Sequence, residues 1–301
     1  MDFKPFFSVV IPTYNCADFL KRALISVFDQ TYQNFEIIVI DNSSIDETKN
    51  VIKSFNNQKL KFIELNNNGI IAHSRNQGIK KAKGDWIAFL DSDDYWEPEK
   101  LDRVKHRIEQ KPGAILFCHD EWYVINGVRK SRLRYGPNDK NLYEKLLFNG
   151  NCLSTSAVCL RSDIANQTSG FSERRDFIST EDYEYWIRLS QLGEVVFINE
   201  ILGEWCVHDS NDSVSNPQKH ANAIIAVSDY HFGLWLNKFP NSINKIKYAR
   251  GKTYINAGRI LQKGSLFYKA SKSALKAIQI NPFQWKAWAL LLLSLFKIRR
   301  F

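Results

Sequence analysis

The chain has 301 residues, of which 44% are hydrophobic and 13% aromatic, and its formal net charge is +9. This length suits one large domain with an appendage, and the composition excludes a disordered or low-complexity protein. The five cysteines include no Cys-x-x-Cys pair, which favours reduced thiols in a cytosolic protein over a disulfide framework or a zinc site. No long apolar run follows Met1–Pro5, so no signal peptide is expected there.

The positive charge is concentrated at one end of the chain. Residues 230–301 contain 14 Lys and Arg and no Asp or Glu, which leaves residues 1–229 with a net charge of −5. We therefore expect an acidic domain followed by a basic tail.

The first hundred residues alternate between strand and helix patterns. Strands are predicted at 6–11, 35–40, 61–65 and 86–90, and helices at 17–29, from about 46 to 55, and at 70–83. Pro12 is expected to stop the first strand. Repeated βαβ units predict a Rossmann-like α/β fold, with a mostly parallel central sheet and helices on both faces.

Polar clusters follow three of these strands, and in such sheets ligands bind beyond the carboxyl ends of the strands. Each cluster alone is also explained by a helix cap, a turn residue or solvated charge before a helix. Together they favour a ligand site, and the closely spaced carboxylates of the third cluster require a cation or hydrogen-bond donors among them. The clusters are Pro12-Thr13-Tyr14-Asn15, Asp41-Asn42-Ser43-Ser44 and Asp91-Ser92-Asp93-Asp94.

The order of these motifs resembles that of glycosyltransferase family 2 on the GT-A fold, over roughly residues 6–215. The motifs are Val9–Asn15, Asp41, Ser74–Gly78 and Asp91–Asp94. The resemblance implies an inverting, metal-dependent enzyme that moves a sugar from a UDP-sugar to a glycan or lipid-linked acceptor in cell-surface polysaccharide biosynthesis. It also implies a transferase domain at 1–215, which leaves a basic helical region at 216–301.

The resemblance implies a role for each motif. Tyr14 would stack on the uracil, Asp41 would accept a hydrogen bond from it, and Arg75 would lie near the diphosphate. Asp91 would address the ribose, and Asp93 would hold Mn²⁺ or Mg²⁺ between the two phosphates. The rest of the nucleotide-sugar site would come from Pro12, Thr13, Asn15 and Ser92.

Acidic residues also begin a helix predicted at 180–189. The resemblance makes Asp182 the general base and places Glu181 beside the acceptor, while ordinary charge at a helix N-terminus is the alternative. His208 matches the histidine of the family's Arg-x-His segment, which completes the metal shell, although Cys206 stands where the family has arginine. A lone histidine is more often an ordinary surface or core residue.

The segment 121–151 is expected to line the side of the site where the acceptor binds. It contains aromatic and basic residues, Trp122 among them, that suit a sugar or a lipid diphosphate. A solvated excursion from the sheet is the alternative.

The tail is predicted to be helical from about residue 217, with later helices at 248–262, 265–279 and 283–298. The run Ala287–Phe296 is apolar apart from Ser294, and ten helical residues span about 15 Å, too little to cross a bilayer. With basic residues at its end, this helix suits the interface of an anionic membrane, and packing against the main domain is the alternative. We expect a cytoplasmic enzyme at the inner face of the cell membrane. Without a recognised nucleic-acid motif, no nucleic-acid partner is expected.

Two other function classes share the nucleotide-binding pattern. One is a non-catalytic module that binds a sugar nucleotide or a membrane, and the presence of Asp91, Asp93 and Asp182 argues against it. The other is a nucleotidyltransferase, and the first strand is not followed by the Gly-rich, Lys-rich loop that would bind a triphosphate.

Overall fold

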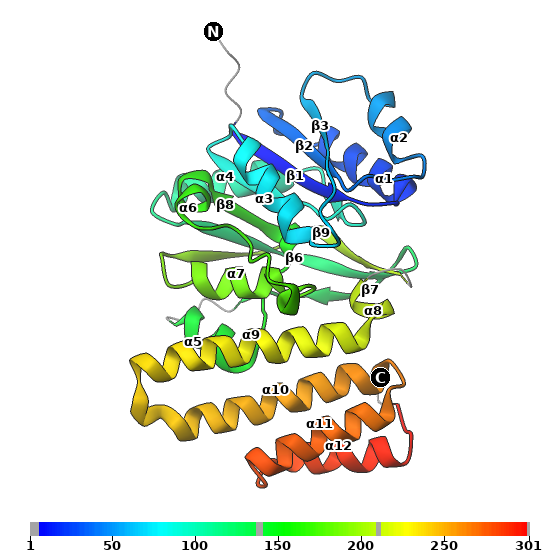
Figure 1. The fold of residues 1–301 in the computed structure, drawn as a ribbon. Coiled ribbons are helices and arrows are strands. Elements are labelled where there is room, and N and C mark those ends of the chain that lie inside the picture. The colour runs from blue at the N-terminus through cyan, green and yellow to red at the C-terminus, as the bar shows by residue number, and fades with distance from the viewer. Residues whose placement is uncertain (1–5, 137–140, 209–211, 300–301) are drawn as a thin grey trace. The chain divides into compact units, whose positions relative to one another are not determined.

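The computed structural model describes residues 6–136, 141–208 and 212–299. The chain forms two compact units that interleave along the sequence (Figure 1). The first unit consists of residues 1–142, 152–172 and 188–208, and the second of residues 143–151, 173–187 and 209–301. The division of the chain into a transferase domain at 1–215 and a basic helical region at 216–301 stays a prediction.

The first unit is built on a mixed sheet, which among the described residues has nine strands in the order β3-β2-β1-β4-β8-β6-β9-β5, with β7 paired to β6. Strands β1 to β4 are parallel to one another, as are β6 and β9, while β5, β7 and β8 pair antiparallel. The strands are β1 (Phe7–Thr13), β2 (Phe35–Asp41), β3 (Leu60–Glu64), β4 (Trp86–Phe89), β5 (Tyr95–Trp96), β6 (Leu116–Ile125), β7 (Val128–Leu133), β8 (Val158–Arg161) and β9 (Val195–Val207).

Helices cover both faces of this sheet. Successive side chains of a strand point to opposite faces, and β1 has apolar side chains on each of them. Val9 and Ile11 share a core with helices α1 (Ala17–Phe28), α2 (Thr48–Ser54) and α4 (Lys100–Gln110). Val10 faces the opposite side, where helix α3 (Ile71–Lys81) packs and α6 (Ser162–Gln167) lies against α3. The predicted α/β architecture is confirmed.

Gly78 of α3 allows this helix to pack very close to β1, because a Cβ atom there would lie 2.3 Å from Cγ1 of Val10. We expect Gly78→Ala to lower the free energy of unfolding by about 1–3 kcal/mol, since the helix must shift away from the sheet. Urea denaturation measures the change. Gly113→Ala is the matched control, because nothing lies within 4 Å of its added Cβ, and an unchanged midpoint for Gly78→Ala would contradict the close packing.

The predicted stop at Pro12 is wrong, because β1 continues to Thr13 and Pro12 pairs with Ile40 of β2. The ladder between β1 and β4 ends at Val10. Even-numbered residues of β1 point their backbone groups toward β4, as the bond from Leu90 N–H to the Val10 carbonyl shows. The missing N–H of Pro12 therefore falls where no partner strand needs it.

The described part of segment 121–151 contains regular structure. The end of β6 and all of β7 form a hairpin, and helix α5 (Leu142–Asn149) follows. Five of the six residues of β7 are exposed, and its basic side chains include Arg129 and Arg132. The expected basic and aromatic surface thus lies on a β-hairpin.

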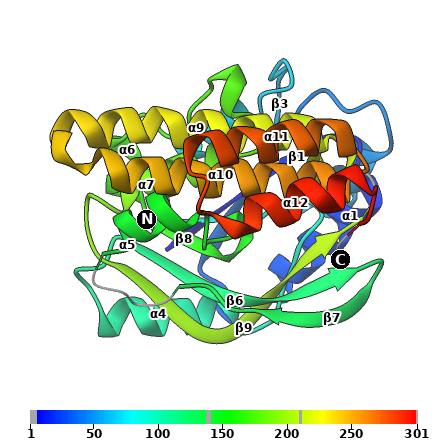
Figure 2. The same ribbon diagram turned by 90° about the horizontal axis from the view of Figure 1, so that it is seen from below.

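The second unit consists mainly of helices, and its last four pack side by side in chain order (Figures 1 and 2). Helix α10 contacts α9, α11 and α12. The predicted helical tail is confirmed, with α10 beginning five residues earlier than expected. No helix of the described residues has both the length and the apolar character needed to cross a membrane. Its helices are α5 from Tyr143 onward, α7 (Glu181–Leu189) as far as Ile187, α8 (Asp212–Ser215), α9 (Pro217–Lys238), α10 (Ile243–Lys263), α11 (Phe267–Ile280) and α12 (Trp285–Leu295). Short 3₁₀ turns lie at Arg175–Phe177 and Pro240–Ser242 in this unit and at Thr155–Ala157 in the first unit.

Candidate functional site

The acidic loop, residues Asp91–Asp94, follows β4 and is joined to α3 by an ion pair. Nη2 of Arg75 lies 2.6 Å from Oδ1 of Asp91. Arg75 is only 3% exposed, and its guanidinium lies 5.4 Å from the ring centre of Phe171. Because a buried guanidinium requires a nearby negative charge, this pair holds the start of the acidic loop in place. The structure thus brings together two of the residues assigned to the sugar nucleotide.

Asp93 and His208 form the second contact of this loop. Nε2 of His208, just after β9, lies 3.1 Å from Oδ2 of Asp93. The imidazole stacks on the ring of Phe19 from α1, with centroids 4.4 Å apart. Both side chains remain partly open to solvent, at 25% for Asp93 and 17% for His208. The expected proximity of Asp93 and His208 is therefore present, and the histidine stacks on Phe19, which was not among the predicted site residues.

This pair fits a divalent cation by the chemistry of its donors, one carboxylate oxygen and one imidazole nitrogen. Within the part of the chain that the structure describes, no three His, Cys, Asp or Glu residues gather as a metal site. Phosphate oxygens and water commonly complete the ligand shell of Mg²⁺ in phosphate-binding sites.

Asp94 ties the acidic loop to two other segments. Its Oδ1 accepts a hydrogen bond of 2.8 Å from the N–H of Cys206, and its Oδ2 accepts one of 2.5 Å from the hydroxyl of Ser156. The same hydroxyl oxygen accepts the N–H of Asp91 at 3.0 Å. Asp94 is 2% exposed. It therefore fixes β9 two residues before His208, a role that no local pattern in the sequence indicated.

Cys16 links the loops that follow β1 and β4. Its Sγ lies 3.1 Å from Oγ1 of Thr13 and 3.1 Å from Oγ of Ser92. Thr13 and Ser92 were both predicted site residues, and the thiol between them was not. Only its position immediately before α1 marks Cys16 in the sequence.

The loop after β2 lies against the loop after β1. The N–H of Asn15 donates to Oγ of Ser44 at 2.9 Å, and Oδ1 of Asn15 accepts the N–H of Ile45 at 2.9 Å. Asn15 has φ of +46°, a left-handed conformation that asparagine tolerates better than most residues. Asp41 is fully buried and accepts hydrogen bonds from both the N–H and the hydroxyl of Ser44. The carboxylate of Asp41 thus organises this loop, and its contact with a base stays a prediction.

Tyr14 differs from its neighbours in being exposed. Its relative exposure is 57%, whereas Thr13 on β1 is buried. An open ring at the carboxyl end of a strand suits stacking against a planar base, which stays a prediction.

A guanidinium lies beside Cys206, the residue that the resemblance aligns with an arginine. Nη2 of Arg22, from α1, is 2.8 Å from Sγ of Cys206 and 2.9 Å from Oε2 of Glu204. Burial, with the charge of Asp94, raises the pKa of the Cys206 thiol to about 12, so this side chain stays a neutral thiol.

Buried titratable groups lie on β6 and α4, in the interior of the first unit. Lys100 is fully buried, with its Nζ 3.3 Å from the ring centre of Trp96, and burial lowers its pKa. Burial also raises the pKa of Glu121 to about 7 and lowers that of His119 to about 3. The hydroxyl of Tyr135 donates to Oε2 of Glu121 at 2.8 Å.

The raised pKa of Glu121 makes its contribution to stability depend on pH. The folded protein retains a proton that the unfolded chain releases above its ordinary pKa of 4.5, so the contribution is complete below pH 4.5 and is lost as the pH rises through about 7. Glu121→Gln removes this dependence. We expect the free energy of unfolding of the variant, measured against the wild type by urea denaturation, to increase between about pH 5 and pH 8. A difference that stays constant with pH would contradict an ionisable group buried at this position.

Two arginine side chains of β7 lie over the ring of Trp122 on β6. The guanidinium groups of Arg129 and Arg132 lie 5.6 and 5.3 Å from its ring centre. Tyr123 packs against Trp205 of β9 with centroids 5.4 Å apart. The role of Trp122 toward an acceptor stays a prediction.

Glu181 and Asp182 lie in the first turn of α7, in the second unit. Glu181 is 4% exposed, and its Oε2 accepts the N–H of Ser179 at 2.8 Å, the ordinary chemistry of a helix start. Asp182 is half-buried, and its Oδ2 accepts a hydrogen bond of 3.3 Å from Nδ2 of Asn151. Their roles beside an acceptor stay predictions.

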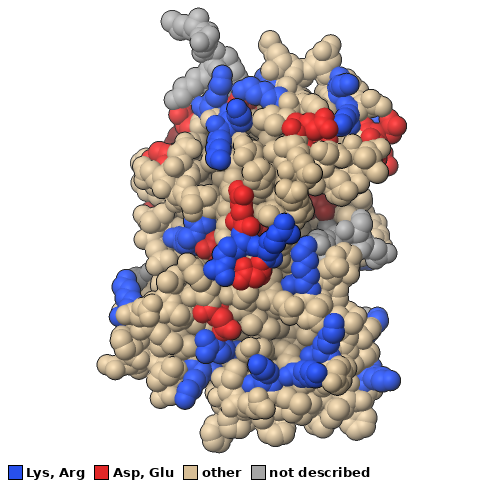
Figure 3. Space-filling view, in the orientation of Figure 1, with Lys and Arg blue, Asp and Glu red and all other residues tan. Residues whose placement is uncertain are grey.

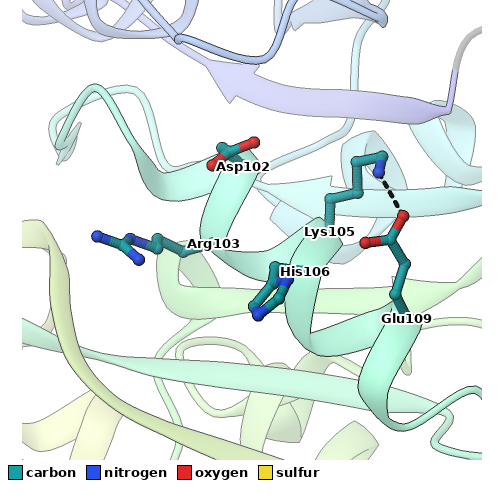
Figure 4. Close-up of a pocket in the computed structure, with 5 residues that line it drawn as sticks. All are labelled: Asp102, Arg103, Lys105, His106 and Glu109. Atoms are coloured by element: carbon teal, nitrogen blue, oxygen red, sulfur yellow. Dashed lines mark hydrogen bonds and ion pairs between the residues drawn. The ribbon is translucent and has the colours of Figure 1, made fainter.

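A separate hollow lies along α4 and holds none of the predicted site residues (Figure 4). Its lining residues all belong to this helix, and Lys105 turns toward Glu109, with which it forms an ion pair of 2.5 Å. Such an i, i+4 pair is an ordinary feature of a helix surface.

Comparison with known proteins agrees with the fold and the motifs. The family described as Glycosyl transferase family 2 matches residues 8–166, slightly more than half of the chain. One relative is the UDP-Glc:alpha-D-GlcNAc-diphosphoundecaprenol beta-1,3-glucosyltransferase WfaP of Escherichia coli, 32% identical over 191 residues that cover 62% of this chain and 70% of that protein.

Solved structures share the fold at low sequence identity. S. aureus TarS 1-349 in complex with UDP-GlcNAc has a TM-score of 0.63 and 18% identity, over 96% of this chain and 90% of that chain. The mannosyltransferase PcManGT from Pyrobaculum calidifontis, in complex with GDP-Man and Mn²⁺, has a TM-score of 0.59 and 14% identity, over 98% of this chain and 88% of that chain.

Proposed function

The chain belongs to glycosyltransferase family 2, and from this premise we propose that it transfers a sugar from a UDP-sugar to a lipid-linked saccharide or glycan, with inversion at the anomeric carbon. The observation that carries the proposal is the acidic loop. There Asp91 forms an ion pair with the buried Arg75, and Asp93, two residues later, lies beside His208 with both side chains partly open to solvent.

The donor would bind along the loops at the carboxyl ends of β1, β2 and β4. The exposed ring of Tyr14 would stack on the uracil, above the loop that Asp41 holds in place. Asp91 would meet the ribose, with Arg75 near the diphosphate. Pro12, Thr13, Asn15 and Ser92 would shape the remainder of the pocket.

Asp93 and His208 would hold Mn²⁺ or Mg²⁺. Such an ion, when bound, neutralises the negative charge that develops on the departing diphosphate. Asp182 would accept the proton of the acceptor hydroxyl while that oxygen attacks the anomeric carbon from the face opposite the diphosphate, which inverts its configuration. Glu181 would support the first turn of α7 beside the acceptor, and Trp122 would contribute an aromatic surface for it.

The relatives support the choice of substrates. WfaP is named for a UDP-sugar donor and a diphosphoundecaprenol acceptor, and TarS was crystallised with UDP-GlcNAc. A lipid-linked acceptor and the basic tail together favour a cytoplasmic enzyme associated peripherally with an anionic membrane at its inner face. In this proposal residues 1–215 catalyse sugar transfer, and residues 216–301 attach the enzyme to the membrane.

The test is a transfer assay with the purified chain, a panel of UDP-sugars, GDP-mannose as a comparison, and a lipid-linked saccharide acceptor. We expect transfer from a UDP-sugar that requires Mn²⁺ or Mg²⁺ and stops when EDTA is added. The anomeric configuration of the product, read by NMR, should be opposite to that of the donor. Activity that survives EDTA would overturn the metal assignment, and release of pyrophosphate from a nucleoside triphosphate would favour a nucleotidyltransferase.

A further inference from the structure

The outward face of α12 is apolar along its whole length. Ala287, Leu290 and Ser294 point inward and are at most 3% exposed. The opposite face consists of residues spaced three or four apart, so that they line up along the helix. These residues are Trp285 (67% exposed), Trp288 (47%), Leu292 (56%) and Leu295 (63%).

Neighbouring residues extend this apolar face beyond both ends of the helix. Phe283 is 93% exposed before the helix begins, and Phe296 is 74% exposed where it ends. A surface helix normally presents polar or charged side chains to water, and α12 presents indole rings and leucines instead. Contiguous exposed apolar surface of this kind marks a site of interaction.

Positive charge borders the face, and negative charge is absent from this part of the sequence. Residues 230–301 contain 14 Lys and Arg and no acidic residue. Nζ of Lys286 lies 5.8 Å from the ring centre of Trp285, and Lys269, Lys272 and Lys276 are exposed on α11. Over α11 and α12 the space-filling view shows blue and tan surface without red (Figure 3).

We propose that α12 lies flat in the headgroup region of an anionic bilayer, with Trp285, Trp288, Leu292 and Leu295 turned toward the acyl chains. This inference rests on the proposed peripheral association with a membrane and assigns the surface that makes the contact. Lys286, beside Trp285, then lies close to the lipid phosphates. A helix of 11 residues is about 16 Å long, so it lies along the interface and does not cross it.

Charge and hydrogen bonding favour lipid over a second copy of the chain. Two copies that met through this face would bring their basic tails together, whereas anionic headgroups neutralise them. The indole N–H of Trp288 already donates to the carbonyl of Pro282 at 2.9 Å. Its ring can therefore enter an apolar layer without leaving that donor unpaired.

The full chain would be sedimented with vesicles of phosphatidylcholine alone and of phosphatidylcholine mixed with phosphatidylglycerol. We expect binding to the anionic vesicles that weakens with salt, and a loss of about tenfold or more in affinity for Trp285→Ser/Trp288→Ser. Leu192→Ser is the matched control, since Leu192 is 54% exposed in the first unit, and it should bind as the wild type does. Vesicle lipids brominated in their acyl chains should quench tryptophan fluorescence of the wild type more than that of the double variant.

Equal affinity of wild type and double variant for anionic vesicles would overturn the proposal. So would light scattering that shows a dimer of the wild type and a monomer of the double variant, because the face would then join two copies. Transfer to a water-soluble saccharide acceptor separates this proposal from the proposed function, because the double variant should retain it. If no form of the chain transferred sugar while vesicle binding followed the expected pattern, the proposed function alone would fail.

Discussion

Replacing Asp182 by asparagine is expected to lower kcat for sugar transfer by about 10²–10⁴-fold. An amide cannot accept the proton of the acceptor hydroxyl, whereas its size and its Oδ1 atom preserve the hydrogen bond from Asn151. Binding of the donor should hardly change, because the residues assigned to it lie on other loops. The measurement is the steady-state rate of transfer, together with the affinity for UDP by calorimetry.

Asn151→Ala is the matched control for Asp182→Asn, because it removes the hydrogen-bonding partner and leaves the carboxylate. We expect it to reduce kcat far less than Asp182→Asn does. Full transferase activity in Asp182→Asn would show that Asp182 is not the base. Equal losses in the two variants would assign Asp182 to holding α7 in position.

Substitution by asparagine should affect sugar transfer very differently at the adjacent residues Asp93 and Asp94. Asp93→Asn removes the charged ligand of the proposed cation and should lower transfer by about 10³-fold, since a metal at a developing charge contributes several kcal/mol. It should also raise the Mn²⁺ concentration needed for half of the remaining activity. Asp94→Asn should retain most activity, because the amide oxygen can still accept the N–H of Cys206 and the amide N–H₂ can donate to Ser156.

Asp94→Ala tests whether those hydrogen bonds position His208. Without an acceptor at residue 94, the N–H of Cys206 is left buried and unpaired, and β9 can shift near His208. A misplacement of about 1 Å can cost about 10²-fold in rate, so we expect this loss together with a raised Mn²⁺ requirement. Thermal melting of each variant separates loss of fold from loss of position. Wild-type metal dependence in Asp94→Ala would contradict the positioning role.

The regular elements of the first hundred residues could be predicted because each is encoded locally. The apolar runs of β1, β2 and β4 and the helical spacing in α1 depend only on neighbours along the chain. The polar clusters after those strands could be predicted for a related reason, since parallel strands bring their carboxyl ends to one edge. The end of β1 was mistaken because the effect of Pro12 depends on where β4 stops pairing, which is a property of the sheet.

The acidic loop Asp91–Asp94 likewise combines features set by neighbouring residues with features set by the tertiary structure. Its three carboxylates, their place at a strand end and their need for a cation or hydrogen-bond donors follow from the sequence alone, because they depend on consecutive residues and on Coulomb repulsion. The partners of those carboxylates were decided by the tertiary structure. Arg75, Ser156 and His208 reach Asp91, Asp94 and Asp93 from distant parts of the chain. No local pattern specifies such contacts, because sheet pairing and helix packing between remote segments determine which side chains meet.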